Sequence, residues 1–344
     1  MTSVVCPCCP LHCDDIDAAS LRSGATGCSV ADARLATIRS ESLATVDDGI
    51  IEKCRQWISE ASAITLTGHV IDLETSRAIA DVVRQTNATT NFDGGNPWMR
   101  ETITREGGFF STLGELKQRG RVLMVIGDVV RHWPRLTSIL QDAKRIAHWK
   151  DDEQLASKLA SLRLMVTKRF GATDITDPTV IDVAERIAPL ESLIILVAPL
   201  EESVSRSPVI YSSLLGLVRE LNQVKRASIL TFDHSLTVRS VLATRDESRA
   251  LPFATPAASL CIHFAPFGES KSKSLPGQKT IVIGSGDAVF HKNEISLPAS
   301  VPGYHHRAIV IRGDGSVTLP IEGCNAESKS VIPAVQLRRL FETT

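Results

Sequence analysis

Short apolar runs along the chain alternate with longer stretches in which apolar residues recur every three or four positions. The runs predict buried strands, because each is nearly continuous in aliphatic residues and several end in glycine or another small residue. Six of them stand out: ITLTG (64–68), VLMVIG (122–127), LIILVA (193–198), SILTF (228–232), LCIHF (260–264) and TIVIGSG (280–286).

The segments between these runs have helical periodicity. Residues 73–86 predict a helix with Asp72 or Thr75 as its N-cap, and residues 213–223 predict another with a broad apolar face. Alternation of strands and helices is typical of parallel, doubly wound α/β domains. Ligands of such domains bind beyond the carboxyl ends of the strands.

The patterning also suggests how the chain is divided. Strand-like runs give way to charged helical sequence between about 151 and 192, and the last segment has short strands, prolines and a GDG turn. We therefore expect a cysteine-rich N-terminal lobe at 1–50, a first α/β domain at 51–150 with a second at 190–290, and a β-rich tail at 291–344.

Composition narrows the class of protein. The 344 residues are 43% hydrophobic and 22% charged with a net charge of -1, which fits a globular protein with a core and no basic field. We expect no nucleic-acid partner and no membrane partner, because aromatic residues are few and no run approaches the roughly 20 apolar residues of a spanning helix. No signal-peptide pattern is present, so we expect a cytoplasmic protein, in which clustered cysteines more often bind metal than form disulfides.

Five of the eight cysteines lie in the first 28 residues. With Cys8 omitted, the spacing is Cys6-x2-Cys9-x3-Cys13, followed by Cys28 after fourteen residues. Four thiolates are what a [4Fe–4S] cluster requires, one for each iron. The pattern therefore favours Cys6, Cys9, Cys13 and Cys28 as ligands of a [4Fe–4S] cluster.

Two alternatives to a cluster stay open. Four thiolates also form a tetrahedral zinc site, although zinc ribbons usually pair two C-x2-C turns, whereas three of these cysteines share one loop. Reduced, packed thiols without metal are the second alternative. Cys8 is surplus to four ligands, and the sequence assigns it no role.

The cysteine pattern continues into a resemblance to a known family. The cysteines, the Asp14-Asp15-Ile16 that follows them, and GCSVADARL around Cys28 resemble the beginning of the B-type component of formylmethanofuran dehydrogenase, a molybdopterin oxidoreductase family. STLGELKQRGRVLMVIGDVVRHWPRL (111–136) is a second specific similarity. GLVRELNQ (216–223) and LPASVPGYHHRAIVIRGDGSVTLPI (297–321) are weaker ones.

The resemblance implies a fold of the molybdopterin-oxidoreductase type and a [4Fe–4S] cluster on the four cysteines. It also implies a bis-pterin tungsten or molybdenum centre that interconverts carbon dioxide and formate. The cysteine or selenocysteine that binds that metal has no counterpart, since no cysteine lies between Arg55 and Leu260. Asp93, Gly94 and Gly95 occupy the nearest equivalent position, so we expect tungsto- or molybdopterin to be absent.

The chain is also shorter than the redox family in the segments where pterin-binding loops are expected. It resembles better the bacterial branch, in which homologous subunits form a formyltransferase/hydrolase complex of methanofuran-dependent one-carbon metabolism. We expect a non-catalytic B-like subunit that contacts A-, C- and D-like subunits. The alternatives are an active dehydrogenase subunit with a non-cysteine metal ligand, and an unrelated metal-stabilised scaffold.

Three further positions are weaker candidates. His305 and His306 are adjacent and would point to opposite faces of a strand, so they cannot readily share one metal. IGSGDA (283–288) fits an ordinary strand-to-helix turn, and HWPR (132–135) follows a predicted strand at its ligand-binding end. The sequence assigns no role to His305 or His306.

Overall fold

The structure is a computed structural model that describes residues 3–40, 46–92, 102–103, 105–119, 122–141, 143–167, 175–200, 208–244, 259–268, 278–286, 289–325 and 331–342. The chain divides into two compact units. Unit 1 comprises Met1–Gly94 and Asp233–Thr344, and unit 2 comprises Gly95–Phe232. The segment 51–150, expected as one α/β domain, is shared between the two units.

Unit 1 is built on a mainly parallel sheet. In the described residues the strand order is β11-β12-β10-β9-β3-β4, and every neighbouring pair is parallel except β11 with β12. The strands are β3 (Ile64–Gly68), β4 (Thr89–Asn91), β9 (Leu260–Ala265), β10 (Lys279–Gly284), β11 (Val289–His291) and β12 (Glu294–Pro298).

Four helices of unit 1 share one core with this sheet. They are α3 (Asp48–Glu60), α4 (Leu73–Thr86), α13 (Leu236–Thr244) and α14 (Pro333–Phe341). Alternate strand residues such as Ile262, Phe264 and Ile281 enter this core. Asp72 is the N-cap of α4, because its carboxylate accepts a hydrogen bond from the Thr75 backbone N–H at 2.8 Å.

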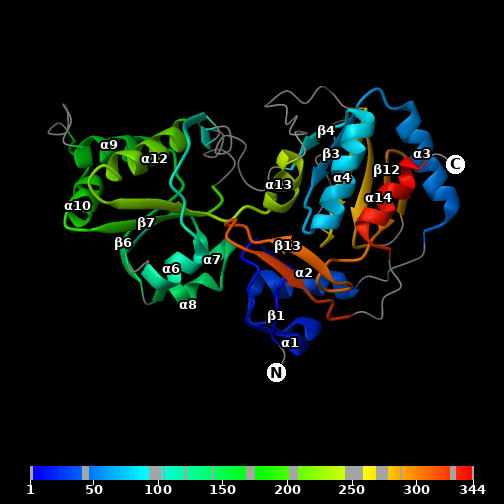
Figure 1. Ribbon diagram of the computed structural model, residues 1–344, viewed down its shortest axis with the longest axis horizontal. Coiled ribbons are helices and arrows are strands. Elements are labelled where there is room, and N and C mark those ends of the chain that lie inside the picture. Colours follow the sequence, from blue (N-terminus) through cyan, green and yellow to red (C-terminus); the bar gives the residue numbers. More distant parts are fainter. Residues whose placement is uncertain are drawn as a thin grey trace. The chain divides into compact units, whose positions relative to one another are not determined.

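Unit 2 contains a four-stranded, fully parallel sheet in the order β6-β5-β7-β8. The inner strand β5 (Val122–Ile126) is buried on both faces: Met124 and Ile126 enter one core, while Leu123 and Val125 are buried on the other side. Figure 1 shows α9, α10 and α12 on one side of this sheet and α6, α7 and α8 on the other. The strands are β5 (Val122–Ile126), β6 (Lys144–Trp149), β7 (Ser192–Val197) and β8 (Arg226–Leu230). The helices are α6 (Leu113–Arg119), α7 (Val129–His132), α8 (Leu136–Gln141), α9 (Leu155–Thr167), α10 (Pro178–Ile187) and α12 (Pro208–Leu221).

The parallel α/β class and all six predicted strands are confirmed. The sequence pattern missed strand β6, whose Lys144 and Arg145 are exposed because it lies at a sheet edge. The sequence pattern also missed helix α14, which lies in the segment expected to be β-rich. In the same segment, β13 (Ala308–Ile311) and β14 (Thr318–Ile321) pair as a separate antiparallel sheet. Among the described residues, no helix is long and apolar enough to cross a membrane.

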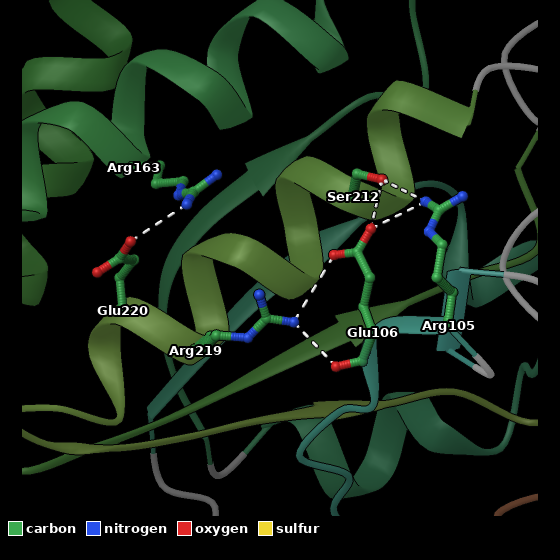
Figure 2. A network of polar contacts seen from close by, with 6 residues as sticks. All are labelled: Arg105, Glu106, Arg163, Ser212, Arg219 and Glu220. Carbon is green, nitrogen blue, oxygen red and sulfur yellow. Dashed lines mark hydrogen bonds and ion pairs between the residues drawn. The ribbon is translucent and has the colours of Figure 1, made fainter.

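A network of ion pairs fixes helix α12 against its neighbours (Figure 2). Glu106 accepts hydrogen bonds from Arg105 at 2.9 Å and from Ser212 at 3.1 Å, and the hydrogen bond from Arg105 lowers the pKa of its carboxyl group. Arg219 donates to the Glu106 backbone carbonyl at 2.9 Å. The segment before α6 is thereby held along α12.

The same helix explains the GLVRELNQ similarity as a packing motif. A Cβ at Gly216 would lie 2.7 Å from Nη1 of Arg163, so the glycine leaves room for this α9 side chain to cross α12. Arg163 then reaches Glu220 at 3.1 Å, and Glu220 is only 8% exposed. Asn222 donates to the Ala227 carbonyl at 2.6 Å and links the end of α12 to β8.

We predict that Arg163→Met lowers the free energy of unfolding by about 1–2 kcal/mol, because it leaves the largely buried Glu220 carboxylate without its ion-pair partner. Adding Glu220→Gln should recover part of this loss. The matched control is Arg226→Met, since the Arg226–Glu115 pair at 2.9 Å involves an arginine that is 62% exposed. That variant should change stability by no more than about 0.5 kcal/mol. Urea unfolding of the full chain measures all three, and equal effects of Arg163→Met and Arg226→Met would contradict the prediction.

Candidate metal centre

A short hairpin presents the predicted cysteine ligands. Strand β1 (Ser3–Val4) pairs antiparallel with β2 (Ile16–Asp17), and beyond this pair the Cys6 N–H donates to the Cys13 carbonyl at 2.8 Å. This hydrogen bond joins the two ends of residues 6–13, which we call the cysteine loop. Pro7 and Pro10 restrict the backbone between them.

His12 sets the shape of the cysteine loop. Its backbone has φ 43°, in the left-handed region that non-glycine residues rarely adopt, and its N–H donates to the Cys9 carbonyl at 3.1 Å. Its Nδ1 lies 3.1 Å from the Cys6 carbonyl, which only accepts, so Nδ1 carries the hydrogen. Burial lowers the pKa of His12 to about 4, with nearby His69 and Arg312 adding to the effect. The imidazole is therefore neutral at physiological pH.

Cys28 lies at the start of helix α2 (Ser29–Ser40). The Asp32 N–H donates to the Cys28 carbonyl at 2.8 Å, which makes Cys28 the N-cap residue. Its own N–H donates to the Thr26 hydroxyl at 3.2 Å, and that hydroxyl donates to Asp32 at 2.7 Å. The N-terminus of a helix carries partial positive charge, and Cys28 lies at that end of α2.

The structure places three of the predicted ligands near the fourth. Cys9 is buried, and its thiol pKa is raised by burial first and then by the neighbouring Cys6, Cys13 and Cys28. Cys6 and Cys28 are also buried, and Cys13 is partly exposed. Cys28 acts on Cys9 although it comes from a separate segment of the chain, at the start of α2.

The two other cysteines of this lobe differ in position. Cys8 is completely buried in an apolar cluster, and its backbone carbonyl accepts a hydrogen bond from Arg34. Cys324 was missed by the sequence analysis, because it is distant along the chain. It packs on the same cluster, and burial, with a smaller contribution from Cys6, raises its pKa to about 11.

The chemistry of the donor set suits an iron–sulfur cluster. Each iron of a [4Fe–4S] cube binds its own thiolate. The four ligands therefore surround a group larger than a single ion. Cysteines from a loop and from the start of a separate helix can surround such a group. Across the part of the chain that the structure describes, no group of three or more His, Cys, Asp or Glu side chains is arranged to hold a single metal ion.

The cysteine loop lies next to the ligand-binding edge of the unit 1 sheet. From β3 the chain continues to β4 on one side of β3, whereas β9 lies on the other side of β3. The strand order therefore reverses between β3 and β9, and ligands of such sheets bind at the carboxyl ends of the two strands at this point. At this edge His69 follows β3, and its ring lies 5.7 Å from that of Phe267, which follows β9. The Arg34 guanidinium lies 4.8 Å from the Phe267 ring centroid. Phe267 belongs to the same buried cluster as Cys6, Cys8 and Cys28.

His305 and His306 lie in a tight turn instead of a strand, because the Gly303 N–H donates to the His306 carbonyl at 2.8 Å. Nδ1 of His305 accepts from the Val301 N–H at 2.9 Å, and Nδ1 of His306 lies 2.8 Å from the Ser300 hydroxyl. Burial, with a contribution from His306, lowers the pKa of His305 to about 4. These contacts assign both histidines to the packing of the turn.

The remaining candidates are structural or lie outside the described residues. Asp93, Gly94 and Gly95 are not among the described residues, nor are the last two residues of IGSGDA. In HWPR, Trp133 is buried and packs edge-on against Phe232 with ring centroids 4.9 Å apart.

The chain resembles known proteins in its structure and not in its sequence. No family model matches the sequence. No curated protein matches it either. Among solved structures, the chain is similar to a chain of the formyltransferase/hydrolase complex (FhcABCD) from Methylorubrum extorquens, determined in complex with methylofuran. The TM-score is 0.65 at 16% identity, over 87% of this chain and 96% of that chain. At this identity the likeness establishes a shared fold.

The low pKa of His305 predicts a specific pH dependence of stability. The unfolded imidazole binds a proton below about pH 6.5, whereas the folded one resists protonation down to about pH 4, so this contribution is complete above pH 6.5 and is lost on acidification between those values. We predict that His305→Asn, whose amide oxygen still accepts from Val301, makes the loss of stability between pH 7 and pH 5 smaller by about 2 kcal/mol. Urea unfolding at both pH values measures this, and identical pH profiles for variant and wild type would contradict it.

Proposed function

We propose that this chain is the B-like, non-redox subunit of a formyltransferase/hydrolase complex related to formylmethanofuran dehydrogenase. The observation that carries the proposal is the shared fold with a chain of such a complex. The sequence similarities, which begin at the cysteine loop and continue in order to the tail, favour the same kind of complex.

The extent of the likeness supports the non-redox form of the subunit. The match covers 96% of the other chain, so the shared fold has nearly the whole length of that protein. We therefore attribute the short length of this chain, relative to subunits with pterin-binding loops, to the formyltransferase/hydrolase branch. The absence of any cysteine between Arg55 and Leu260 supports the same proposal, because the family binds its tungsten or molybdenum through such a residue.

We propose that Cys6, Cys9, Cys13 and Cys28 hold a [4Fe–4S] cluster with a structural role. The support is that Cys6, Cys13 and Cys28 lie near enough to Cys9 to raise its pKa, that three of the four thiols are buried, and that Cys28 occupies a helix N-terminus. A cluster on these residues would tie the hairpin to α2 beside the carboxyl edge of the sheet. The cluster supplies cross-linking there, and the chain itself carries out no redox step.

The proposed partners are A-, C- and D-like subunits. Exposed apolar side chains are candidate contact residues, because a partner that covers them removes apolar surface from water. Among the described residues, six of the eight exposed large apolar side chains belong to unit 2, which makes unit 2 the main candidate for contacts with partners. They are Phe109, Phe110, Val130, Leu164, Val209 and Val224.

We predict that the tagged full-length chain, purified under anaerobic conditions from its own organism, carries with it subunits that have formyltransferase and formylmethanofuran hydrolase activity. The complex should not reduce artificial electron acceptors with formate. Phe109→Ser with Phe110→Ser should weaken the association, whereas Val335→Ser, a similarly exposed position in unit 1, should not. Formate-dependent reduction of acceptors, or partners without formyl chemistry, would contradict the proposal.

The cluster assignment has its own test in a pair of adjacent cysteines. We predict that Cys9→Ala lowers the iron content of the purified complex below the wild-type value of about four per chain, because one iron loses its ligand. Cys8→Ala should retain all the iron, although removal of a buried sulfur costs some stability. Iron and acid-labile sulfide measurements compare the two. Loss of iron in Cys8→Ala with retention in Cys9→Ala would reverse the ligand assignment.

A further inference from the structure

The turn that joins β13 to β14 is in direct contact with the cysteine loop. The Gly313 N–H donates to the Pro10 carbonyl at 2.7 Å, and the Gly313 carbonyl accepts from the Asp233 N–H at 2.9 Å. A Cβ at this position would lie 2.6 Å from the Pro10 Cβ and 2.9 Å from the Asp233 nitrogen. Only glycine permits this approach, because backbone atoms on both sides cannot move aside.

This contact brings Arg312 to the end of the cysteine loop, next to Asp14 and near His12. Its guanidinium forms an ion pair at 3.2 Å with Asp14, the residue that follows Cys13. The Arg312 side chain is only 11% exposed. Within the described residues its Nε is buried and has no hydrogen-bond acceptor, so the guanidinium keeps a donor that Asp14 does not use.

The negative charge of the proposed cluster explains why a buried arginine would lie near the cysteine loop. A [4Fe–4S] cube with four thiolates carries a net negative charge, which increases by one on reduction. Negative charge in a largely buried site is costly unless cations or hydrogen-bond donors surround it. Asp14 and Asp15 add further negative charge nearby. The N-terminus of α2 offers partial positive charge at Cys28, and Arg34 is engaged with the Cys8 carbonyl and the Phe267 ring.

We propose that Arg312 is a cation that compensates the negative charge of the [4Fe–4S] cluster. Its charge neutralises Asp14 and offsets the negative charge of the cluster, and its buried Nε–H is a donor that Asp14 does not use. This inference rests on the proposed cluster at Cys6, Cys9, Cys13 and Cys28. Arg312 favours the more negative, reduced state and therefore raises the reduction potential, which net charge and hydrogen bonding control in such clusters.

Three variants of the full-length chain, purified anaerobically with its partners, test the proposal. Arg312→Gln removes the positive charge. Arg312→Lys keeps the positive charge but lacks the planar guanidinium group and its Nε–H donor. Arg307→Gln removes an arginine on the same lobe that is 72% exposed and pairs with Glu322 at 3.3 Å. The readouts are iron content and the reduction potential from a dithionite titration followed by electron paramagnetic resonance.

We expect Arg312→Gln to shift the potential to more negative values, while Arg312→Lys stays closer to wild type and Arg307→Gln matches it. If Arg312→Gln loses its iron, then iron and a near-wild-type potential in Arg312→Lys support the same conclusion. A potential unchanged in Arg312→Gln overturns the inference, as does an equal shift or iron loss in Arg312→Lys. Wild-type protein without iron overturns the cluster proposal itself, whereas iron in wild type with no effect of Arg312→Gln overturns only the role of Arg312.

Discussion

The close approach of Gly313 to Pro10 is the contact on which the candidate site depends, because it joins the beginning of the chain to its tail. One hydrogen bond of 2.7 Å links residues about three hundred positions apart, and the crowding around Gly313 leaves no alternative residue. With the β13–β14 turn in this place, Arg312 reaches Asp14 beside Cys13. Cys324 and the turn of His305 and His306 pack near the same lobe. The cysteine-rich lobe is thus completed by the tail, although the two are separate segments in the sequence.

The physical problem at this site is the burial of negative charge. Burial, together with the neighbouring Cys6, Cys13 and Cys28, raises the pKa of the Cys9 thiol, so negative charge at this position is costly unless positive charge compensates it. A bound cluster would supply iron for this purpose, and the helix N-terminus at Cys28 and the guanidinium of Arg312 would supply the rest. The neutral His12 fits the same requirement, because it shapes the loop through hydrogen bonds without adding charge.

Sequence patterning predicted the strands that are buried on both faces, since a run such as LIILVA has little choice of environment. It failed for β6, which lies at an edge and exposes Lys144 and Arg145, and for α14, which follows a segment with strand signals. For the candidate site, spacing selected Cys6, Cys9, Cys13 and Cys28, and their role as ligands stays a prediction. It could not select Arg312, Arg34 or Cys324, because no local pattern connects them to the cysteine loop. Their positions follow from tertiary packing, and a GDG turn indicates only that the chain reverses there.

The central claim is that a B-like subunit has kept a cluster and lost its redox metal. The most direct test is elemental analysis, with a visible spectrum, of the complex purified anaerobically from its own organism. We expect about four irons with matching sulfide per chain and no tungsten or molybdenum. Stoichiometric tungsten or molybdenum would contradict the claim and make the chain part of an active dehydrogenase. Absence of iron would equally contradict it and leave the cysteine loop a packing element.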